Sequence, residues 1–181
     1  MRYLLILIIA ISSQVFAKDT ELKLFRPFNG EVSFTVEQTL KGECLAQSAL
    51  IKRQDALHCV ANQEPYDPCF IKEYGNHKKV LCLNSPWESK AIEIDLSSPI
   101  DNSEHLSLDM SRTYPWGLLL TSGEKCTAVA EDESFDGLKV HYRCDNGSVL
   151  VGHVQRCASQ WSILQKKNNE VLTAAIVKAW F

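Results

Sequence analysis

The chain has 181 residues, of which 45% are hydrophobic and 23% charged, and its formal net charge at pH 7 is −3. These values fit one globular domain. The basic pairs Lys52-Arg53, Lys78-Lys79 and Lys166-Lys167 are isolated and are expected on solvated faces, so no basic patch suggests a nucleic-acid partner.

The first seventeen residues predict a secretory signal peptide. Arg2 precedes an apolar run from Tyr3 to Ile11, and Val15-Phe16-Ala17 has the small residues that a signal peptidase requires. The run is about half the ~20 residues of a membrane span, so an uncleaved anchor is the less favoured alternative. Cleavage would leave a mature chain with a net charge of −4 and no segment that spans a membrane. We therefore expect export to the periplasm or the extracellular medium.

Residues 18–29 are predicted to form an irregular N-terminal arm, and residues 30–181 a single β-rich domain. Residues 31–37 have the composition of a strand. Residues 48–60 fit either a short helix or a strand. Pro65 and Pro68 are expected to interrupt regular structure before the next strand.

The first hairpin is predicted around Gly75-Asn76, because glycine suits the first central position of a type II′ turn. Pairing outward from this turn places Ile71 opposite Val80 and Cys69 opposite Cys82. The two cysteines then occupy a non-hydrogen-bonded pair, with Cα atoms close enough for a disulfide. We predict the bridge Cys69–Cys82.

The middle of the chain predicts two strands separated by a long polar loop. Apolar and acidic residues alternate over residues 92–96, which indicates a half-buried strand. Residues 97–112 are expected to form the loop, and residues 116–120 a short buried strand.

The last third predicts a meander of strands. Residues 138–144 alternate, and the Asn146-Gly147 turn would place Cys144 opposite Val149 and Tyr142 opposite Val151. Residues 161–165 and 171–177 form another predicted pair around Asn168-Asn169. The expected fold is mainly β, a small antiparallel sandwich or barrel with irregular loops and disulfides.

Disulfides are expected because exported proteins usually oxidise their cysteines. A hairpin could bridge Cys126 and Cys144, but only through a loose loop centred on Phe135, because a strict Asp136-Gly137 turn places Cys126 opposite Gly147. Of the remaining cysteines, Cys44 and Cys59 close a short loop worth about 3 kcal/mol. Cys157 is then the free thiol.

The sequence contains no recognised catalytic, phosphate-binding or metal-binding motif, and we assign no catalytic residue, metal or cofactor. A histidine pair, or carboxylates among Asp55, Asp67, Asp95 and Asp109, could still meet in space, although turn capping and pairing with Arg53 are the favoured roles of these aspartates.

Cys157 has no histidine after it, which argues against a papain-like nucleophile. Asn146-Gly147-Ser148 matches a glycosylation sequon but is interpreted first as a turn. Core packing is the favoured role of the four tryptophans, and exposure would suit a glycan or peptide; they are Trp87, Trp116, Trp161 and Trp180.

A set of spaced motifs resembles a family of exported bacterial proteins of uncharacterised activity. The motifs are Arg53-x-Asp55-Ala56-x-x-Cys59, Asp67-Pro68-Cys69-Phe70, Cys82 with Pro86-Trp87, Pro115-Trp116, Cys126, Tyr142-x-Cys144 and Ala179-Trp180-Phe181. Six cysteines match the pattern of this family from Cys44 onward, and Cys157 departs from it. The resemblance implies export and a framework of six cysteines, and it implies no activity.

A stapled scaffold without a recognised catalytic constellation favours a non-enzymatic binding or interaction module outside the cytoplasm, with an unknown protein or glycan partner. The alternatives are a secreted hydrolase with an unrecognised carboxylate or histidine site, and a secreted effector.

Overall fold

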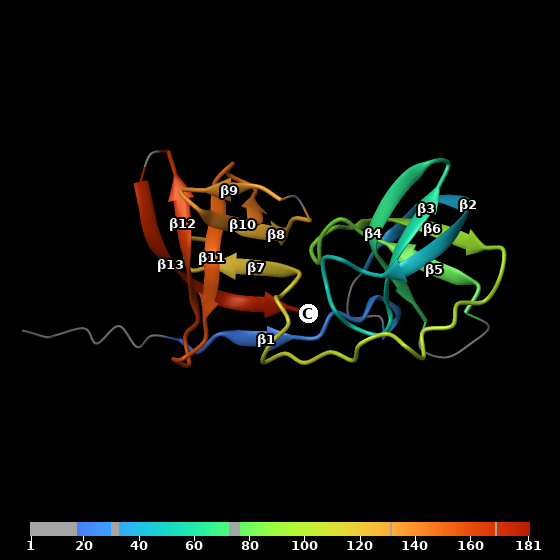
Figure 1. The fold of residues 1–181 in the computed structure, drawn as a ribbon, viewed down its shortest axis with the longest axis horizontal. Helices are drawn as coiled ribbons and strands as arrows, with labels where there is room; N and C mark the ends of the chain where they lie inside the picture. Colours follow the sequence, from blue (N-terminus) through green and yellow to red (C-terminus); the bar gives the residue numbers. More distant parts are fainter. Residues whose placement is uncertain (1–17, 30–32, 73–76, 131, 169) are drawn as a thin grey trace, which may run out of the picture.

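The computed structural model describes residues 18–29, 33–72, 77–130, 132–168 and 170–181, and the predicted signal peptide lies outside the described residues. The fold is mainly β, as predicted. Its strands form two closed barrels that lie side by side, with the C-terminus between them (Figure 1). Both barrels fall within the range 30–181 that the sequence predicts as one domain.

The first barrel contains five strands. Neighbouring strands pair antiparallel, except that the first and last pair in parallel and close the barrel. The strands are β2 (Thr35–Gln47), β3 (Ala56–Ala61), β4 (Glu64–Ile71), β5 (Lys79–Cys82) and β6 (Lys90–Leu96).

The second barrel is an antiparallel meander that closes when its last strand pairs with its first. Its strands are β7 (Gly117–Leu120), β8 (Lys125–Ala128), β10 (Leu138–Cys144), β11 (Val149–Gln155), β12 (Ser162–Lys167) and β13 (Glu170–Trp180). The short β9 (Ser134–Phe135) pairs with β10. The described part of the loop from residue 97 to 116 contains no strand, as predicted, and it connects the two barrels (Figure 1).

The N-terminal arm is more regular than the sequence suggests. Strand β1 (Glu21–Lys23) pairs in parallel with the end of β13, and a 3-10 turn follows at Pro27–Asn29. The prediction of an irregular arm fails here because the partner strand lies more than 150 residues away in sequence, and local periodicity carries no sign of it. The side chain of Phe25 is 2% exposed, so the arm contributes to the core.

Two further expectations in the first barrel need correction. The strand predicted at residues 31–37 begins at Thr35 and continues to Gln47. Pro65 and Pro68 lie within β4 and do not interrupt it. The pairing of β3 with β4 shifts register between Leu57 and Cys59, opposite Pro68. Proline is tolerated at such irregularities because it removes only one ladder hydrogen bond.

The first hairpin has the predicted register. Cys69 lies opposite Cys82 and Ile71 lies opposite Val80. The turn at Gly75-Asn76 itself lies outside the described residues.

The Asn146-Gly147 hairpin forms with a register one residue away from the prediction. Arg143 lies opposite Val149, and Tyr142 opposite Leu150. The loop contains three residues instead of two, and Gly147 has a φ of 81°. A type I turn followed by a left-handed glycine has this geometry. The one-residue change directs Tyr142 and Leu150 together into the core.

The structure also settles how Cys126 meets Cys144. Asp136-Gly137 is a tight turn, with Leu138 opposite Phe135, yet Cys144 still lies opposite Cys126. The strict turn alone would place Cys126 opposite Gly147, three residues beyond Cys144. The segment between β8 and β9 contains the three additional residues that correct this register, so a strict turn and the disulfide are compatible.

The three predicted pairs are the disulfides of the structure: Cys44–Cys59, Cys69–Cys82 and Cys126–Cys144. Each bridges two neighbouring strands of one barrel. Cys157 is the free cysteine and is exposed.

Two hydrophobic clusters fill the molecule. The smaller cluster lies inside the first barrel and includes Leu57, Ile71 and Ile94. The larger one fills the second barrel and extends to the outer face of the first, where Phe70 and Leu81 contact it. The end of β4, from Pro68 to Ile71, and the end of β5, from Val80 to Cys82, are therefore buried on both faces.

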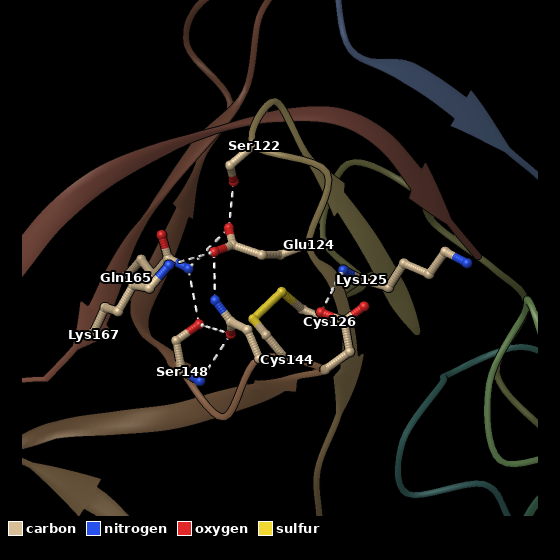
Figure 2. Close-up of a disulfide and its surroundings, with 10 residues drawn as sticks. Ser122, Glu124, Lys125, Cys126, Cys144, Ser148, Gln165 and Lys167 are labelled. Carbon is tan, nitrogen blue, oxygen red and sulfur yellow. Dashed lines mark hydrogen bonds and ion pairs between the residues drawn. A yellow bond between two sulfur atoms is a disulfide. The ribbon is translucent and has the colours of Figure 1, made fainter.

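Glu124 is a polar hub beside the Cys126–Cys144 disulfide (Figure 2). Its side chain is 11% exposed. The carboxylate accepts hydrogen bonds from Ser122, Asn146 and Gln165, and it pairs with Lys167 at 3.1 Å. The amide of Asn146, the acceptor of the sequon, is thus engaged within the fold, which agrees with its interpretation as a turn residue.

The Glu124→Gln variant is expected to lose about 1–3 kcal/mol of unfolding free energy. Its side-chain NH₂ group would replace one carboxylate oxygen and would face groups that donate hydrogen bonds to that oxygen in the native protein. Hydrogen bonds from Ser122 and Lys167 lower the pKa of Glu124. Its contribution should therefore be present above pH 4.5 and decline as the pH falls. Urea unfolding at neutral and acidic pH measures both effects. Equal stability of variant and native protein at neutral pH would contradict the role of the hub.

Candidate functional site

A pocket of about 450 Å³ lies where the arm, the first barrel and the connecting loop meet. This volume lies within the range of small-molecule sites in proteins. The pocket is lined by Leu24, Arg26, Pro27, Phe28, Asn29, Arg53, Gln54, Asp55, Ile71, Lys72, His77, Asn102, Ser107 and Leu108.

Arg53 forms a rigid part of the pocket wall. Its guanidinium donates two hydrogen bonds to the carboxylate of Asp55, both at 2.5 Å. It also donates to the main-chain oxygens of Phe25 at 2.7 Å and Phe181 at 2.9 Å. The side chain is 6% exposed, so the prediction that Lys52-Arg53 is a solvated pair is wrong for Arg53. This one residue connects the arm, the first barrel and the end of the second.

Reciprocal amide contacts fix another part of the pocket wall. Gln54 donates to the main-chain oxygen of Asn102 at 3.2 Å, and Asn102 donates to that of Gln54 at 3.1 Å. Gln47 likewise donates to the main-chain oxygen of Leu106 at 2.8 Å. The connecting loop is thereby held against the first barrel, and the pocket is largely formed before any ligand arrives.

The electrostatic character of the pocket is basic. Arg53 and Asp55 neutralise each other, and Asp55 is the only carboxylate among the described lining residues. Arg26 and Lys72 also line the pocket, and within the described chain neither forms an ion pair. His77 adds an imidazole. Among the described residues, no carboxylate pairs with the positive charges of Arg26 and Lys72, and these two residues line the same pocket as the apolar side chains of Leu24 and Phe28.

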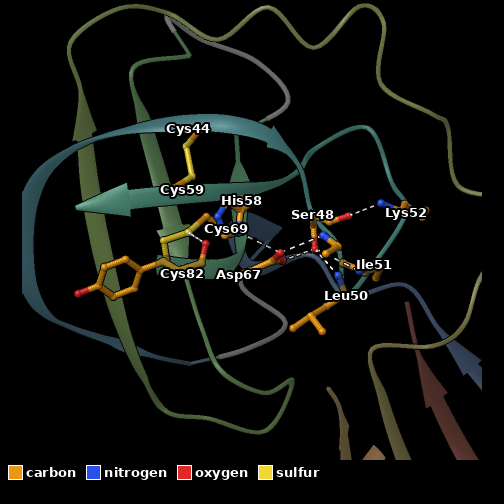
Figure 3. A network of polar contacts seen from close by, with 12 residues as sticks. Cys44, Ser48, Leu50, Ile51, Lys52, His58, Cys59, Asp67, Cys69 and Cys82 are labelled. Carbon is orange, nitrogen blue, oxygen red and sulfur yellow. Dashed lines mark hydrogen bonds and ion pairs between the residues drawn. A yellow bond between two sulfur atoms is a disulfide. The ribbon is translucent and has the colours of Figure 1, made fainter. Parts of the chain in front are cut away.

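Ser48, Asp67 and His58 form a polar network in the first barrel (Figure 3). The hydroxyl of Ser48 donates to Asp67 and accepts the main-chain N–H groups of Leu50 and Ile51 at 3.1 Å. His58 Nδ1 lies 3.3 Å from Asp67.

This network does not have the order of a hydrolase triad. A catalytic serine must hydrogen-bond the histidine, whereas Ser48 contacts the aspartate and is fully buried. Ser48 instead caps the turn that leads to β3. Asp67, for which turn capping was predicted, accepts the main-chain N–H of Ala49 in the same turn at 2.9 Å.

The other candidate residues lie apart in separate contacts. Asp95 pairs with Lys79 at 3.0 Å, and Asp109 accepts hydrogen bonds from Ser111. Trp116 is fully buried, and the other three tryptophans are half-buried, which agrees with the core role favoured from the sequence. Among the described residues, no group of three histidine, cysteine, aspartate or glutamate side chains is arranged to bind a metal. In the same residues no helix is long and apolar enough to cross a membrane.

Two histidines do meet on the second barrel. Tyr114 stacks on His141 with ring centroids 4.4 Å apart, and its hydroxyl lies 2.6 Å from Nδ1 of His153. Arg156 lies 4.8 Å from the centroid of Trp161 and donates to the main-chain oxygens of Met110 and Thr113. This cluster holds the end of the connecting loop on the second barrel.

The histidine cluster predicts a pH-dependent stability. Burial lowers the pKa of His141 below 6.5, and the positive charges of Lys139 and His153 lower it further. Below about pH 6.5 the unfolded chain therefore binds more protons than the folded chain. The unfolding free energy is retained above about pH 6.5 and declines as the pH falls toward the lowered pKa of His141 in the folded protein. Thermal unfolding between about pH 7.5 and 5 should show this decline. The His141→Gln variant should show a flatter profile, and an unchanged slope would contradict the assignment.

Cys157 offers a simple test of the disulfide scheme. Because it is exposed and free, Cys157→Ser should change the unfolding free energy by less than about 0.5 kcal/mol. Peptide mapping of the unreduced protein should still recover Cys69 linked to Cys82. A large loss of stability, or Cys157 found in a bridge, would contradict the scheme.

The pocket residues were not predicted as a set. Only Arg53 and Asp55 carried a signal, through their motif. Lys72 and His77 lie in the predicted first hairpin and Arg26 in the predicted arm, but neither pattern marked them as site residues. Comparisons with protein-family models, curated proteins and solved structures returned no match.

Proposed function

We propose that this protein is an exported, non-enzymatic binding module whose ligand occupies the pocket between the arm, the first barrel and the connecting loop. Preorganisation supports the proposal most directly. The walls of the pocket are fixed by Arg53, Gln54 and Asn102 before a ligand binds. A preformed site loses less conformational entropy on binding. Three disulfides are compatible with an oxidising location in the periplasm or outside the cell.

The test is ligand capture by the native protein and by a variant with a filled pocket. Ser107 is exposed and lines the pocket, so Ser107→Trp should obstruct it without removing a core contact. Ser98 is exposed on the same loop and is not part of the lining, which makes Ser98→Trp the matched control.

Each purified protein is incubated with cell-envelope extract, re-isolated and denatured, and the released molecules are identified by mass spectrometry. The native protein and Ser98→Trp should release a common molecule in stoichiometric amount, and Ser107→Trp should not. Equal recovery from all three would overturn the pocket as the binding site. Conversion of the molecule into a product would favour the alternative of an enzyme.

A further inference from the structure

The chemistry of the pocket narrows the class of ligand. Arg26 and Lys72 bring two positive charges that no described residue neutralises, and His77 adds a ring nitrogen for hydrogen bonding. An acidic head group on a ligand would supply the missing counter-charge. Charge-assisted hydrogen bonds of this kind are about twice as strong as neutral ones.

The rest of the lining is suited to an apolar body. Leu24, Phe28, Ile71 and Leu108 come from the arm, the first barrel and the loop, and all contribute to the pocket. Phe28 is 41% exposed, so part of its ring is available for contact. A purely charged small anion would leave this surface in water, and a neutral apolar molecule would leave the two cations unpaired.

We propose that the ligand is an amphipathic anion, a molecule with one carboxylate or phosphate group and an apolar chain or ring of small-molecule size. Arg26, Lys72 and His77 contact the acidic group, and Leu24, Phe28 and Leu108 contact the apolar part. This inference rests on the proposed function, because it names the ligand class of the same pocket.

Isothermal titration calorimetry with decanoate, decylammonium and acetate tests the class directly. Decanoate should bind with one-to-one stoichiometry, and the other two should bind at least about tenfold more weakly, because one lacks the acidic group and the other lacks the chain. Raising the salt concentration should weaken decanoate binding, since the charges involved are partly exposed.

Variants identify the residues. The double variant Arg26→Gln/Lys72→Gln should weaken decanoate binding at least about tenfold. The matched control Arg112→Gln/Lys125→Gln removes two exposed charges outside the pocket and should bind like the native protein. Thermal unfolding of both variants checks that the fold is retained.

Three results would overturn the ligand class: equal binding of decylammonium and decanoate, native affinity in the Arg26→Gln/Lys72→Gln variant, or binding only to anionic phospholipid vesicles and not to free decanoate. If the ligand is not an amphipathic anion, the capture experiment with Ser107→Trp can still succeed. If the capture experiment itself fails, the pocket is not the binding site, so the two failures are distinguishable.

Discussion

The Arg53→Ala variant is expected to lose about 3–5 kcal/mol of unfolding free energy, because it breaks a buried ion pair. The substitution removes the buried partner of Asp55 and leaves the main-chain oxygens of Phe25 and Phe181 without this donor. The main-chain oxygen of Phe25 is then left unsatisfied, which costs about 1–3 kcal/mol, whereas that of Phe181 keeps a hydrogen bond from the main-chain N–H of Phe25 at 2.7 Å. Asp55 is 31% exposed and can be partly rehydrated, which limits its own share of the loss.

Urea unfolding followed by circular dichroism measures this loss. Arg112→Ala is the matched control, because Arg112 is an exposed arginine and its removal should change stability by less than about 0.5 kcal/mol. Arg53→Lys should recover only part of the loss, since an ammonium group cannot make the two parallel bonds to Asp55. A loss of less than about 1 kcal/mol in Arg53→Ala would contradict the role of Arg53 as the junction between barrels and arm.

The Trp116→Ala variant should cost about 3–5 kcal/mol, the usual range for deleting a buried tryptophan. Trp116 is fully buried. Its ring lies 5.1 Å from Phe25 of the arm and 5.5 Å from Phe70 of the first barrel. Its main chain bonds to Trp180 and Ala128 of the second barrel. The substitution therefore opens a cavity at the contact between the two barrels.

Loss of this contact should also reduce the cooperativity of unfolding, because the barrels would share less buried surface. Trp116→Phe is the matched variant. It keeps an aromatic ring and removes the indole N–H, which has no hydrogen-bond partner among the described residues. Trp116→Phe should therefore lose less than half of the unfolding free energy that Trp116→Ala loses. A single sharp transition at native stability in Trp116→Ala would contradict the shared core.

Local patterns in the sequence were sufficient for the first hairpin and its disulfide. Cys69 and Cys82 follow from counting pairs outward from one turn, because antiparallel neighbours along the chain fix each other's register. The same counting failed by one residue at Asn146-Gly147, where a three-residue loop replaced the two-residue turn. Turn length is decided by small energy differences, and core packing of Tyr142 and Leu150 outweighs them here.

Local sequence patterns could not predict the pocket, and the reason is different. Arg26 lies in the arm, Lys72 and His77 lie on either side of the first hairpin turn, and each alone resembles an ordinary surface residue. Arg53 looked like half of a solvated basic pair, although burial and four hydrogen bonds give it a structural role. Such roles depend on which segments meet, and nothing in a window of neighbouring residues encodes that.

Alternation, turns and hairpin spacing act over short distances along the chain, so they were sufficient to predict the β class and the Cys69–Cys82 bridge, and they favoured the other two cysteine pairs and the free thiol that the structure shows. The division of the strands into two barrels could be learned only from the structure. That division depends on the parallel pairing of β2 with β6 and on the pairing of β7 with β13, which join segments more than 40 residues apart. The junction of the two barrels in turn buries Arg53 and helps shape the basic pocket, where we place the function of the protein.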